Sequence, residues 1–330
     1  MAKVNLEELK KIPYIDSNSL SNRIVPSLSF YEEEQWHIYF PSDNDLIKMK
    51  GAIIAEGMYF ARKPESNSDL YLKFLDFLGQ RVLTENLIYP IRGIEDDIMN
   101  IGASLRKFQI LYEYSKVNAK DRSIDVSRMV VTELEYIILV CKSVFDLLQE
   151  IISKIWISVT MTDSKVKKIK LPKNFSKMVL DGDILLSAYA IEKKYNIPKL
   201  LADYYERQGH FFSMLRKSRV NITHFGSTVN PILITDRGFA LVDTLKPFKD
   251  FNVWTESHKL PNGLASLRVS VAYIILKVLS ACEDFTDTIQ QVISFPSEIS
   301  PGFHLFMKTY HGAEYLKLEK IVSECLWYDE

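Results

Sequence analysis

The amino-acid sequence predicts a mainly α protein, because residues that end helices are scarce in it. Twelve glycines and twelve prolines make up about 7% of the 330 residues, whereas roughly 12% is usual. Neither residue occurs between Gly102 and Pro172, or between Gly263 and Pro296. All-β sandwiches need a turn about every 8–12 residues, and disordered chains are rich in Pro, Gly and Ser. Both classes are therefore excluded, and long helices are expected.

Length and composition indicate one to two domains with a large core. The 330 residues exceed the roughly 150 residues of an average domain, and 47% of them are hydrophobic. The pattern of the sequence changes near residue 85. We therefore expect an N-terminal helical appendage over 1–85 and a helical domain over 86–330.

The appendage is expected to contain one short strand and two helices. The segment 35–40, QWHIYF, is typical of a strand. Ser42 followed by Asp45 has the pattern of a helix N-cap with an acidic residue three places on. This pattern predicts a helix over 43–62, and a second, shorter helix fits 69–83.

Two long helices are predicted at the start of the helical domain. From Leu87 to Tyr112, apolar residues recur three and four positions apart, which is the helical period. The polar stretch 118–125 interrupts this pattern, and a second apolar stripe predicts a helix over 126–160. The two helices are expected to form an antiparallel hairpin.

The rest of the domain alternates connectors and helices. Residues 161–199 form a predicted connector with a helical piece near 184–195. Proline suits the first turn of a helix, so Pro198 is expected to open a helix that ends at Gly226. The remaining predicted elements are a β-hairpin over 232–242, a helix over 263–293 and one or two short helices within 302–327.

Charge, cysteines and hydropathy exclude several classes of protein. A net charge of -1 excludes a surface that binds nucleic acid throughout, but allows a local basic patch. The three cysteines lie far apart, so reduced thiols are expected. The longest apolar runs have five or six residues, against the roughly 20 that span a membrane, so we expect no membrane contact and a soluble, cytoplasmic protein. Phosphate-loop, dinucleotide-binding, HExxH and paired CxxC motifs do not occur, so neither a cofactor nor a metal is expected.

One short stretch carries residue types suited to phosphodiester cleavage without a metal. Arg216, Arg219, Asn221 and His224 lie just before Gly226, at a predicted helix end. Histidine moves a proton near neutral pH, and the arginine fork suits the phosphorane that forms during cleavage. Arg219 and His224 are about 140° apart around a straight helix. They meet only if the helix ends or bends before His224, or if a two-fold dimer combines two copies. The alternative is an ordinary basic helix end, with Asn221 bonded to the last carbonyls.

A basic segment, which is densest over 165–173, leads into this stretch. Residues 165–219 contain thirteen Lys or Arg and five Asp or Glu, a balance of +8. The densest part includes Lys167, Lys168 and Lys170, which are expected to bind phosphates. The alternative is that these lysines belong to an ordinary solvated loop. Aromatic residues do not alternate with these lysines, so a stacking platform for single strands is not indicated.

The stretch from Arg219 to His224, RVNITH, matches an R-x4-H pattern. An aromatic-rich helix precedes it, and a predicted hairpin and one long helix follow it. In these features the chain resembles the HEPN superfamily (higher eukaryotes and prokaryotes nucleotide-binding) over residues 86–295. The resemblance implies a HEPN-like helical bundle, RNA as a partner and a homodimer formed through the face that carries the motif.

In active HEPN proteins, the resemblance implies a metal-independent endoribonuclease. His224 would move the proton of the 2′-hydroxyl or of the leaving oxygen, and Arg219 would stabilise the phosphorane. The products would be a 2′,3′-cyclic phosphate and a 5′-hydroxyl, and Arg216 and Asn221 would assist in binding. Active members usually carry Asn, Asp or His directly after the arginine, whereas this chain has Val220. A non-catalytic interaction module therefore stays open as the alternative.

Overall fold

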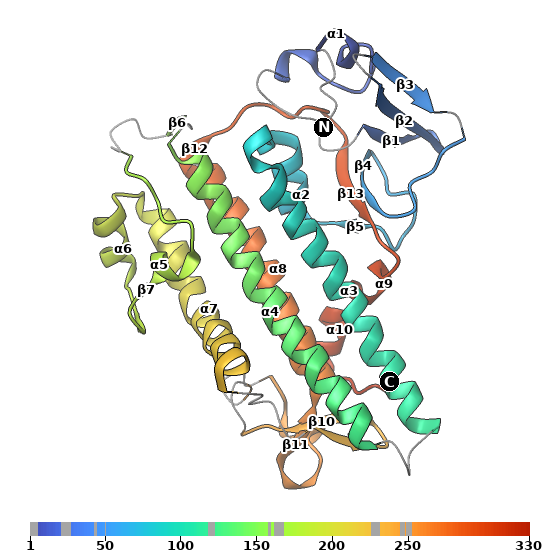
Figure 1. Ribbon diagram of the computed structural model, residues 1–330, viewed down its shortest axis with the longest axis vertical. Helices are drawn as coiled ribbons and strands as arrows, with labels where there is room; N and C mark the ends of the chain where they lie inside the picture. The colour runs from blue at the N-terminus through green and yellow to red at the C-terminus, as the bar shows by residue number, and fades with distance from the viewer. Residues whose placement is uncertain are drawn as a thin grey trace.

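The computed structural model of the protein shows an α/β fold, in which long helices run from a six-stranded sheet at one end to a smaller sheet at the other (Figure 1). The predicted fold, a mainly α bundle with one small β-hairpin and an N-terminal helical appendage, is wrong. It is overturned by the six-stranded mixed sheet and the smaller sheets that accompany the helices. The structure describes residues 6–20, 28–42, 45–49, 51–117, 123–157, 160–161, 168–225, 232–244, 248 and 253–330.

The large sheet is built mostly from the N-terminal part of the chain. Its strand order is β3-β2-β1-β4-β13-β5, with β1 and β4 parallel and the other neighbours antiparallel. The strand predicted over 35–40 is confirmed as β2, whereas the helix predicted over 43–62 is wrong, because this part forms β3 and β4. The strands are β1 (Ser29–Glu32), β2 (Gln35–Ser42), β3 (Asp45–Met49), β4 (Gly57–Ala61), β5 (Leu70–Tyr71) and β13 (His304–Lys308).

Alternation along the strands gives the sheet two apolar faces. Phe30, Phe60 and Leu305 are register partners on three adjacent strands and belong to the main core. Their chain neighbours Tyr59 and Phe306 point the opposite way and form a second, small cluster. Strand β13 comes from the C-terminal part of the chain and lies between β4 and β5. The sheet therefore depends on pairing between distant parts of the sequence.

The second predicted helix of the appendage is confirmed only in part. It consists of α2 (Lys73–Phe77) and a π-helical turn, Leu78–Val82. Within the turn, the buried Gln80 side chain donates a hydrogen bond to the Phe303 carbonyl at 2.7 Å and accepts one from the Ser300 amide at 3.1 Å. The irregular turn thus places an amide side chain where it holds the segment that leads into β13.

Four long helices form the body of the protein. The predicted antiparallel hairpin of the first two is confirmed, and the Ser104 hydroxyl of one donates a hydrogen bond to the Glu133 carboxylate of the other. The helix that Pro198 was predicted to open and the helix predicted over 263–293 are also present. The four helices are α3 (Ile88–Val117), α4 (Ser123–Ile155), α7 (Lys199–Phe225) and α8 (Leu267–Val292).

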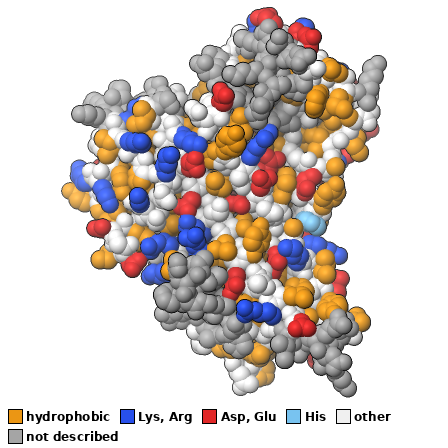
Figure 2. All heavy atoms as spheres, viewed as in Figure 1, with side chains coloured by type: hydrophobic (Ala, Val, Ile, Leu, Met, Phe, Trp, Pro, Cys, Tyr) orange, Lys and Arg blue, Asp and Glu red, His pale blue; other side chains and the backbone are white. Residues whose placement is uncertain are grey.

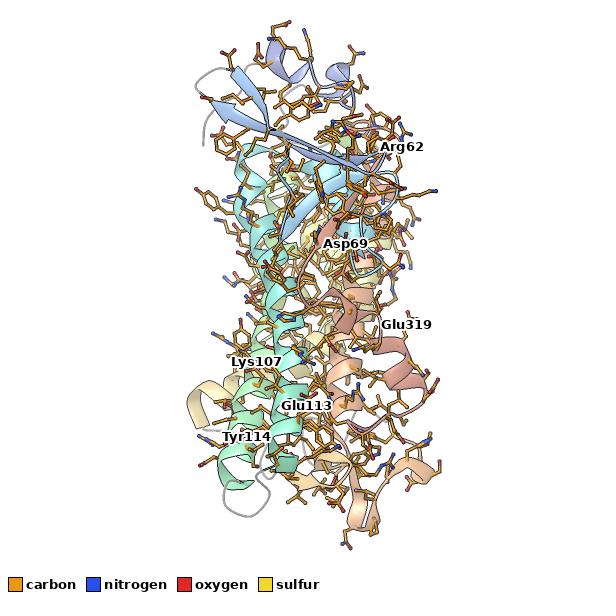
Figure 3. All side chains as sticks on the ribbon, turned by 90° about the vertical axis from the view of Figure 1, so that its right-hand side faces the viewer. Arg62, Asp69, Lys107, Glu113, Tyr114 and Glu319 are labelled. Carbon is orange, nitrogen blue, oxygen red and sulfur yellow. The ribbon has the colours of Figure 1, made fainter. Side chains whose placement is uncertain are left out.

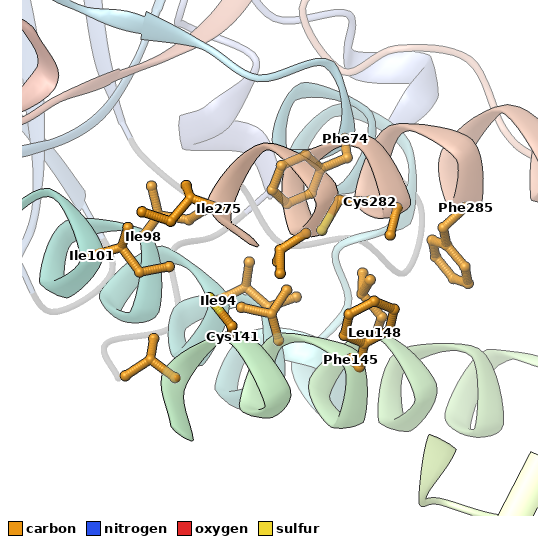
Figure 4. Packing of buried hydrophobic residues seen from close by; sticks show 14 of the residues in the cluster. Phe74, Ile94, Ile98, Ile101, Cys141, Phe145, Leu148, Ile275, Cys282 and Phe285 are labelled. Atoms are coloured by element: carbon orange, nitrogen blue, oxygen red, sulfur yellow. The ribbon is translucent and has the colours of Figure 1, made fainter. Parts of the chain in front are cut away.

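The main core lies between these helices. Figure 4 shows side chains of α3, α4 and α8 pointing toward one another, among them Ile94, Ile98, Phe145 and both Cys141 and Cys282. The two cysteines are buried free thiols, and burial raises the pKa of the Cys141 thiol. Both thiols therefore act as small apolar groups of the core.

The opposite end of the helices carries the second sheet. The predicted hairpin over 232–242 is confirmed, and a third strand is added to it. Figure 3 shows Arg62 and Asp69 at the end with the large sheet, and Lys107, Glu113 and Tyr114 farther along α3. The short helices predicted within 302–327 follow β13. The elements are β9 (Leu233–Thr235), β10 (Gly238–Val242), β11 (Leu264–Ser266), α9 (Gly312–Tyr315) and α10 (Leu318–Ser323).

Candidate nucleic-acid interface

Helix α7 carries the Arg–His motif without a break. Its helical backbone passes through Arg216, Arg219, Asn221 and His224. Arg219 is exposed, and Arg216 donates a hydrogen bond of 2.9 Å to the Asp183 carboxylate. Because the helix does not end before His224, about 140° separates positions 219 and 224 around its axis. A single copy of the chain therefore does not place the two motif residues on one helix face.

Several predicted features fall outside the residues that the structure describes. The side chains of Asn221 and His224 are among them, although their backbone is helical. Gly226, the predicted end of the helix, and Lys167 of the basic segment also lie outside the described residues.

An aromatic face fixes α7 against the bundle. Tyr204, Tyr205 and Phe212 are fully buried. The Tyr205 hydroxyl donates a hydrogen bond of 2.7 Å to the side-chain oxygen of Gln149 in α4. The amide nitrogen of Gln149 in turn donates to the Pro172 carbonyl at 2.7 Å. This chain of hydrogen bonds connects α7, α4 and the basic segment in a buried environment.

Short elements continue from the basic segment and cover α7. The Leu186 amide donates to the Val179 carbonyl at 2.9 Å, and the Tyr195 hydroxyl donates to the Lys177 carbonyl. The helical piece predicted near 184–195 is confirmed over 188–195 as α6, whereas 184–185 form a strand. The elements are α5 (Phe175–Val179), the two-residue strands β7 (Leu180–Asp181) and β8 (Ile184–Leu185), and α6 (Ala188–Tyr195).

The lysines of the basic segment have different surroundings. Lys168 donates a hydrogen bond of 2.6 Å from its ammonium group to the Ile157 carbonyl. Lys170 and Lys173 are exposed ahead of α5, and Lys177 is exposed on it. The ammonium group of Lys168 is thus held against the backbone, whereas the other three extend into solvent.

Positive charge dominates the surface of these elements. Residues 168–219 contain eleven Lys or Arg and five Asp or Glu, a balance of +6. Six exposed lysines of this stretch form no ion pair with the described residues. One of them, Lys217, lies on α7, and we term the surface of the other five the basic face: Lys170, Lys173, Lys177, Lys193 and Lys194. Three other cations are neutralised, in the pairs Lys199–Asp203, Arg207–Asp284 and Arg216–Asp183.

The basic face has the chemistry of an anion-binding surface. Figure 2 shows Lys and Arg side chains gathering on the side of the molecule formed by α5, α6 and α7. Lysines without acidic partners can neutralise phosphates and release the counterions of a nucleic acid. At the margin of this surface, the Arg216 guanidinium lowers the pKa of Asp183, so this carboxylate stays ionised. Arg216 is therefore engaged with Asp183 in the free protein.

Comparisons with known proteins assign no family to the chain. No family model, no curated protein and no solved structure matches it. In the part of the chain that the structure describes, no helix combines the length and apolar character needed to cross a bilayer. The same residues form no group of three His, Cys, Asp or Glu side chains that could hold a metal ion. The ligand of the basic face is therefore inferred from its charges and contacts.

A small recess between α3 and α8 is the wrong size for a nucleotide. Its lining includes Phe108, Gln109, Arg268, Glu314 and Tyr328. The cavity volume is about 20 Å³, which is room for about one water molecule. An RNA segment therefore does not fit into this recess, whereas an open surface such as the basic face has room for it.

The sequence-based prediction missed apolar side chains near the basic face. Ile184 is 74% exposed, Leu185 41% and Tyr189 70%. The ammonium nitrogen of Lys193 lies 5.5 Å from the centre of the Tyr189 ring. Aromatic residues are absent from the densest lysine segment, but α6 brings Tyr189 to the folded surface. The four-residue spacing of Tyr189 and Lys193 on a predicted helix was the available signal.

Proposed function

We propose that the protein binds RNA on its basic face. The observation that carries the proposal is the basic face itself, whose five exposed lysines have no acidic partner among the described residues. The chain as a whole has a net charge of -1, so the positive charge of this surface is a local feature that attracts anions. A polyanion supplies the missing negative charge, and the HEPN resemblance favours RNA over other polyanions.

Three of the five lysines lie on helices that are joined by a hydrogen bond, Lys177 on α5 and Lys193 and Lys194 on α6. The Tyr195 hydroxyl bonds to the Lys177 carbonyl and thereby joins the end of α6 to α5. Lys193 and Lys194 sit on the last turn of α6, so this hydrogen bond fixes their backbone relative to that of Lys177. Such a surface presents its charges to an RNA backbone at a low cost in ordering entropy.

Charge reversal on this surface tests the proposal. The variant Lys177→Glu/Lys193→Glu is expected to lower the affinity for a fluorescein-labelled RNA by more than tenfold in fluorescence anisotropy at fixed salt. Lys63→Glu is the matched control, because Lys63 is exposed in the N-terminal part and forms no ion pair within the described residues. Equal losses in both variants would show binding by overall charge. Absence of RNA binding by the wild type would refute the proposal.

RNA cleavage through the HEPN-like motif is a second candidate function. The unbroken helix α7 favours a composite site, because positions 219 and 224 of one copy lie about 140° apart around the helix axis. In a two-fold dimer, Arg219 of one copy stabilises the phosphorane beside His224 of the other. The 2′-oxygen attacks the adjacent phosphorus, the bond from phosphorus to the 5′-oxygen breaks, and a proton passes from the 2′-hydroxyl to the leaving oxygen.

Cleavage and binding are separable by experiment. For the ribonuclease, we expect a dimer in solution, cleavage that persists in EDTA, 2′,3′-cyclic phosphate ends, and loss of activity in both Arg219→Ala and His224→Ala. RNA that binds but stays intact would restrict the function to binding. A protein that binds no RNA but retains a specific protein partner would support the non-catalytic interaction module, which Val220 favours.

A further inference from the structure

Exposed apolar groups lie close to the unpaired lysines. Tyr189 occupies the first turn of α6 and is 70% exposed, and Lys193 follows one turn later. Ile184 and Leu185 are exposed on the neighbouring strand β8. A ligand that is both anionic and partly apolar would contact both kinds of group.

The backbone around these groups is firmly built. Gly182 has a φ of +61° in the turn between β7 and β8, a conformation that favours glycine. The Ser187 hydroxyl accepts a hydrogen bond from the Ala190 amide and caps α6. Tyr189 follows this cap by two residues, so its backbone position is fixed while its ring remains in solvent. The ring is therefore attached to the surface at a fixed point, takes no part in the main core, and has the Lys193 ammonium nitrogen 5.5 Å from its centre.

We propose that Tyr189 is the stacking residue of a base-binding subsite, which takes an unpaired nucleobase while Lys193 and Lys194 contact the flanking phosphates. This inference rests on the proposed RNA binding. In an A-form duplex the bases stack on one another, so an isolated ring finds no partner there. An unpaired base offers a free π-face, and stacking on an aromatic side chain tolerates any base. The basic face should therefore prefer single-stranded RNA to a duplex.

Anionic lipid is the other ligand with both properties, and the hairpin beside Tyr189 disfavours it. Asp181 and Asp183 are exposed on the same hairpin as Ile184 and Leu185. Insertion of this hairpin into a membrane would bring two carboxylates to an anionic surface and desolvate them. An RNA strand can approach from the side of α6 and leave both carboxylates in water.

The test compares binding of an unstructured RNA of about 12 nucleotides, within the usual site size, with binding of the matching duplex. Tyr189→Ala is expected to weaken single-strand binding by about 5- to 150-fold, the range for one stacked base, and to leave duplex binding unchanged. Tyr189→Phe should keep the affinity, because the ring remains. Tyr89→Ala is the matched control, since Tyr89 is 83% exposed on α3.

Each outcome separates this inference from the function on which it rests. If Tyr189→Ala binds like the wild type while Lys193→Glu binds more weakly, the basic face binds RNA and the stacking subsite is wrong. Equal wild-type affinity for single strand and duplex would overturn the subsite in the same way. If the wild type binds no RNA but binds vesicles of phosphatidylcholine and phosphatidylserine, both the subsite and the proposed function are wrong.

Discussion

Replacing Tyr205 by Phe removes one hydroxyl from the core and tests how the basic segment is held. Tyr205 is fully buried, and its hydroxyl donates to the Gln149 side chain, which is 1% exposed. Without the hydroxyl, the Gln149 oxygen is left buried without its donor, while the ring still fills its space. A buried polar group without a partner costs about 1–3 kcal/mol. We therefore expect Tyr205→Phe to lower the free energy of unfolding by that amount.

Urea unfolding followed by circular dichroism measures this loss. Tyr204→Phe is the matched control: Tyr204 is equally buried, but its hydroxyl donates over a longer distance, 3.3 Å, to the Ala281 carbonyl inside helix α8. That carbonyl is in a helix interior, where a backbone amide is also available as a donor, so a smaller loss is expected. A double-mutant cycle of Tyr205→Phe with Gln149→Leu should give a coupling energy of about 0.5–3 kcal/mol.

The hydrogen bond from Gln149 to the Pro172 carbonyl adds a local effect. Residues 168–175 are expected to exchange their amide hydrogens faster in Tyr205→Phe, because Gln149 has lost the donor that orients it. A variant as stable as the wild type, or additive effects of the two substitutions, would refute the role of this hydrogen-bond chain.

Three further changes test other parts of the fold. Burial raises the pKa of Glu95 to about 7 from 4.5, so stability should fall as pH rises from about 4.5 to about 7, and Glu95→Gln should remove this fall in urea unfolding. Gln80→Leu should destabilise by about 1–3 kcal/mol, because it strips hydrogen bonds from the buried backbone of 300–303. Gly312→Ala should unfold at a clearly lower temperature in calorimetry, since a Cβ there would lie 2.0 Å from the Ser68 carbonyl oxygen.

Each of these predictions has a control and a contradicting result. Gly93→Ala should be milder than Gly312→Ala, because the added Cβ meets only side-chain atoms of Leu147, at 3.1 Å or more. A Glu95→Gln protein whose stability still falls between about pH 4.5 and about pH 7 as in the wild type would contradict the role of Glu95. A stable Gln80→Leu protein would show that water replaces the lost hydrogen bonds.

The long helices could be predicted from the sequence because their signal is local. The apolar stripes of α3 and α4 repeat over many turns, and no glycine or proline interrupts them after Gly102. The sheet could not be predicted in the same way. Residues 45–61 have a cap-like start and enough apolar residues for a helix, but β4 gains its partner β13 from the other end of the chain. Pairing with a strand from a distant part of the chain therefore outweighed the local pattern that favoured a helix.

The candidate site, like the fold, could be predicted from the sequence only in part. The positive charge of the basic segment and of Arg216 is visible in the sequence, and the described cations from Lys170 to Arg219 lie just ahead of α5 and on α5, α6 and α7. The pairing of Arg216 with Asp183 depends on a turn that brings β8 to α7, and no spacing in the sequence shows it. The position of Tyr189 on the surface depends on the packing of α6 against α7. The local excess of positive charge could thus be predicted from the sequence. Which lysines lack acidic partners, and where the Tyr189 ring lies, could be seen only in the folded structure.

The salt dependence of RNA binding tests the central claim most directly. If the lysines of the basic face make about four phosphate contacts, a plot of log affinity against log salt should have a slope of about -3 for a single strand. In Lys177→Ala/Lys193→Ala/Lys194→Ala, the slope should shrink by about 2, while Lys63→Ala leaves it unchanged. A slope that stays at the wild-type value in the triple variant would contradict RNA binding on this face.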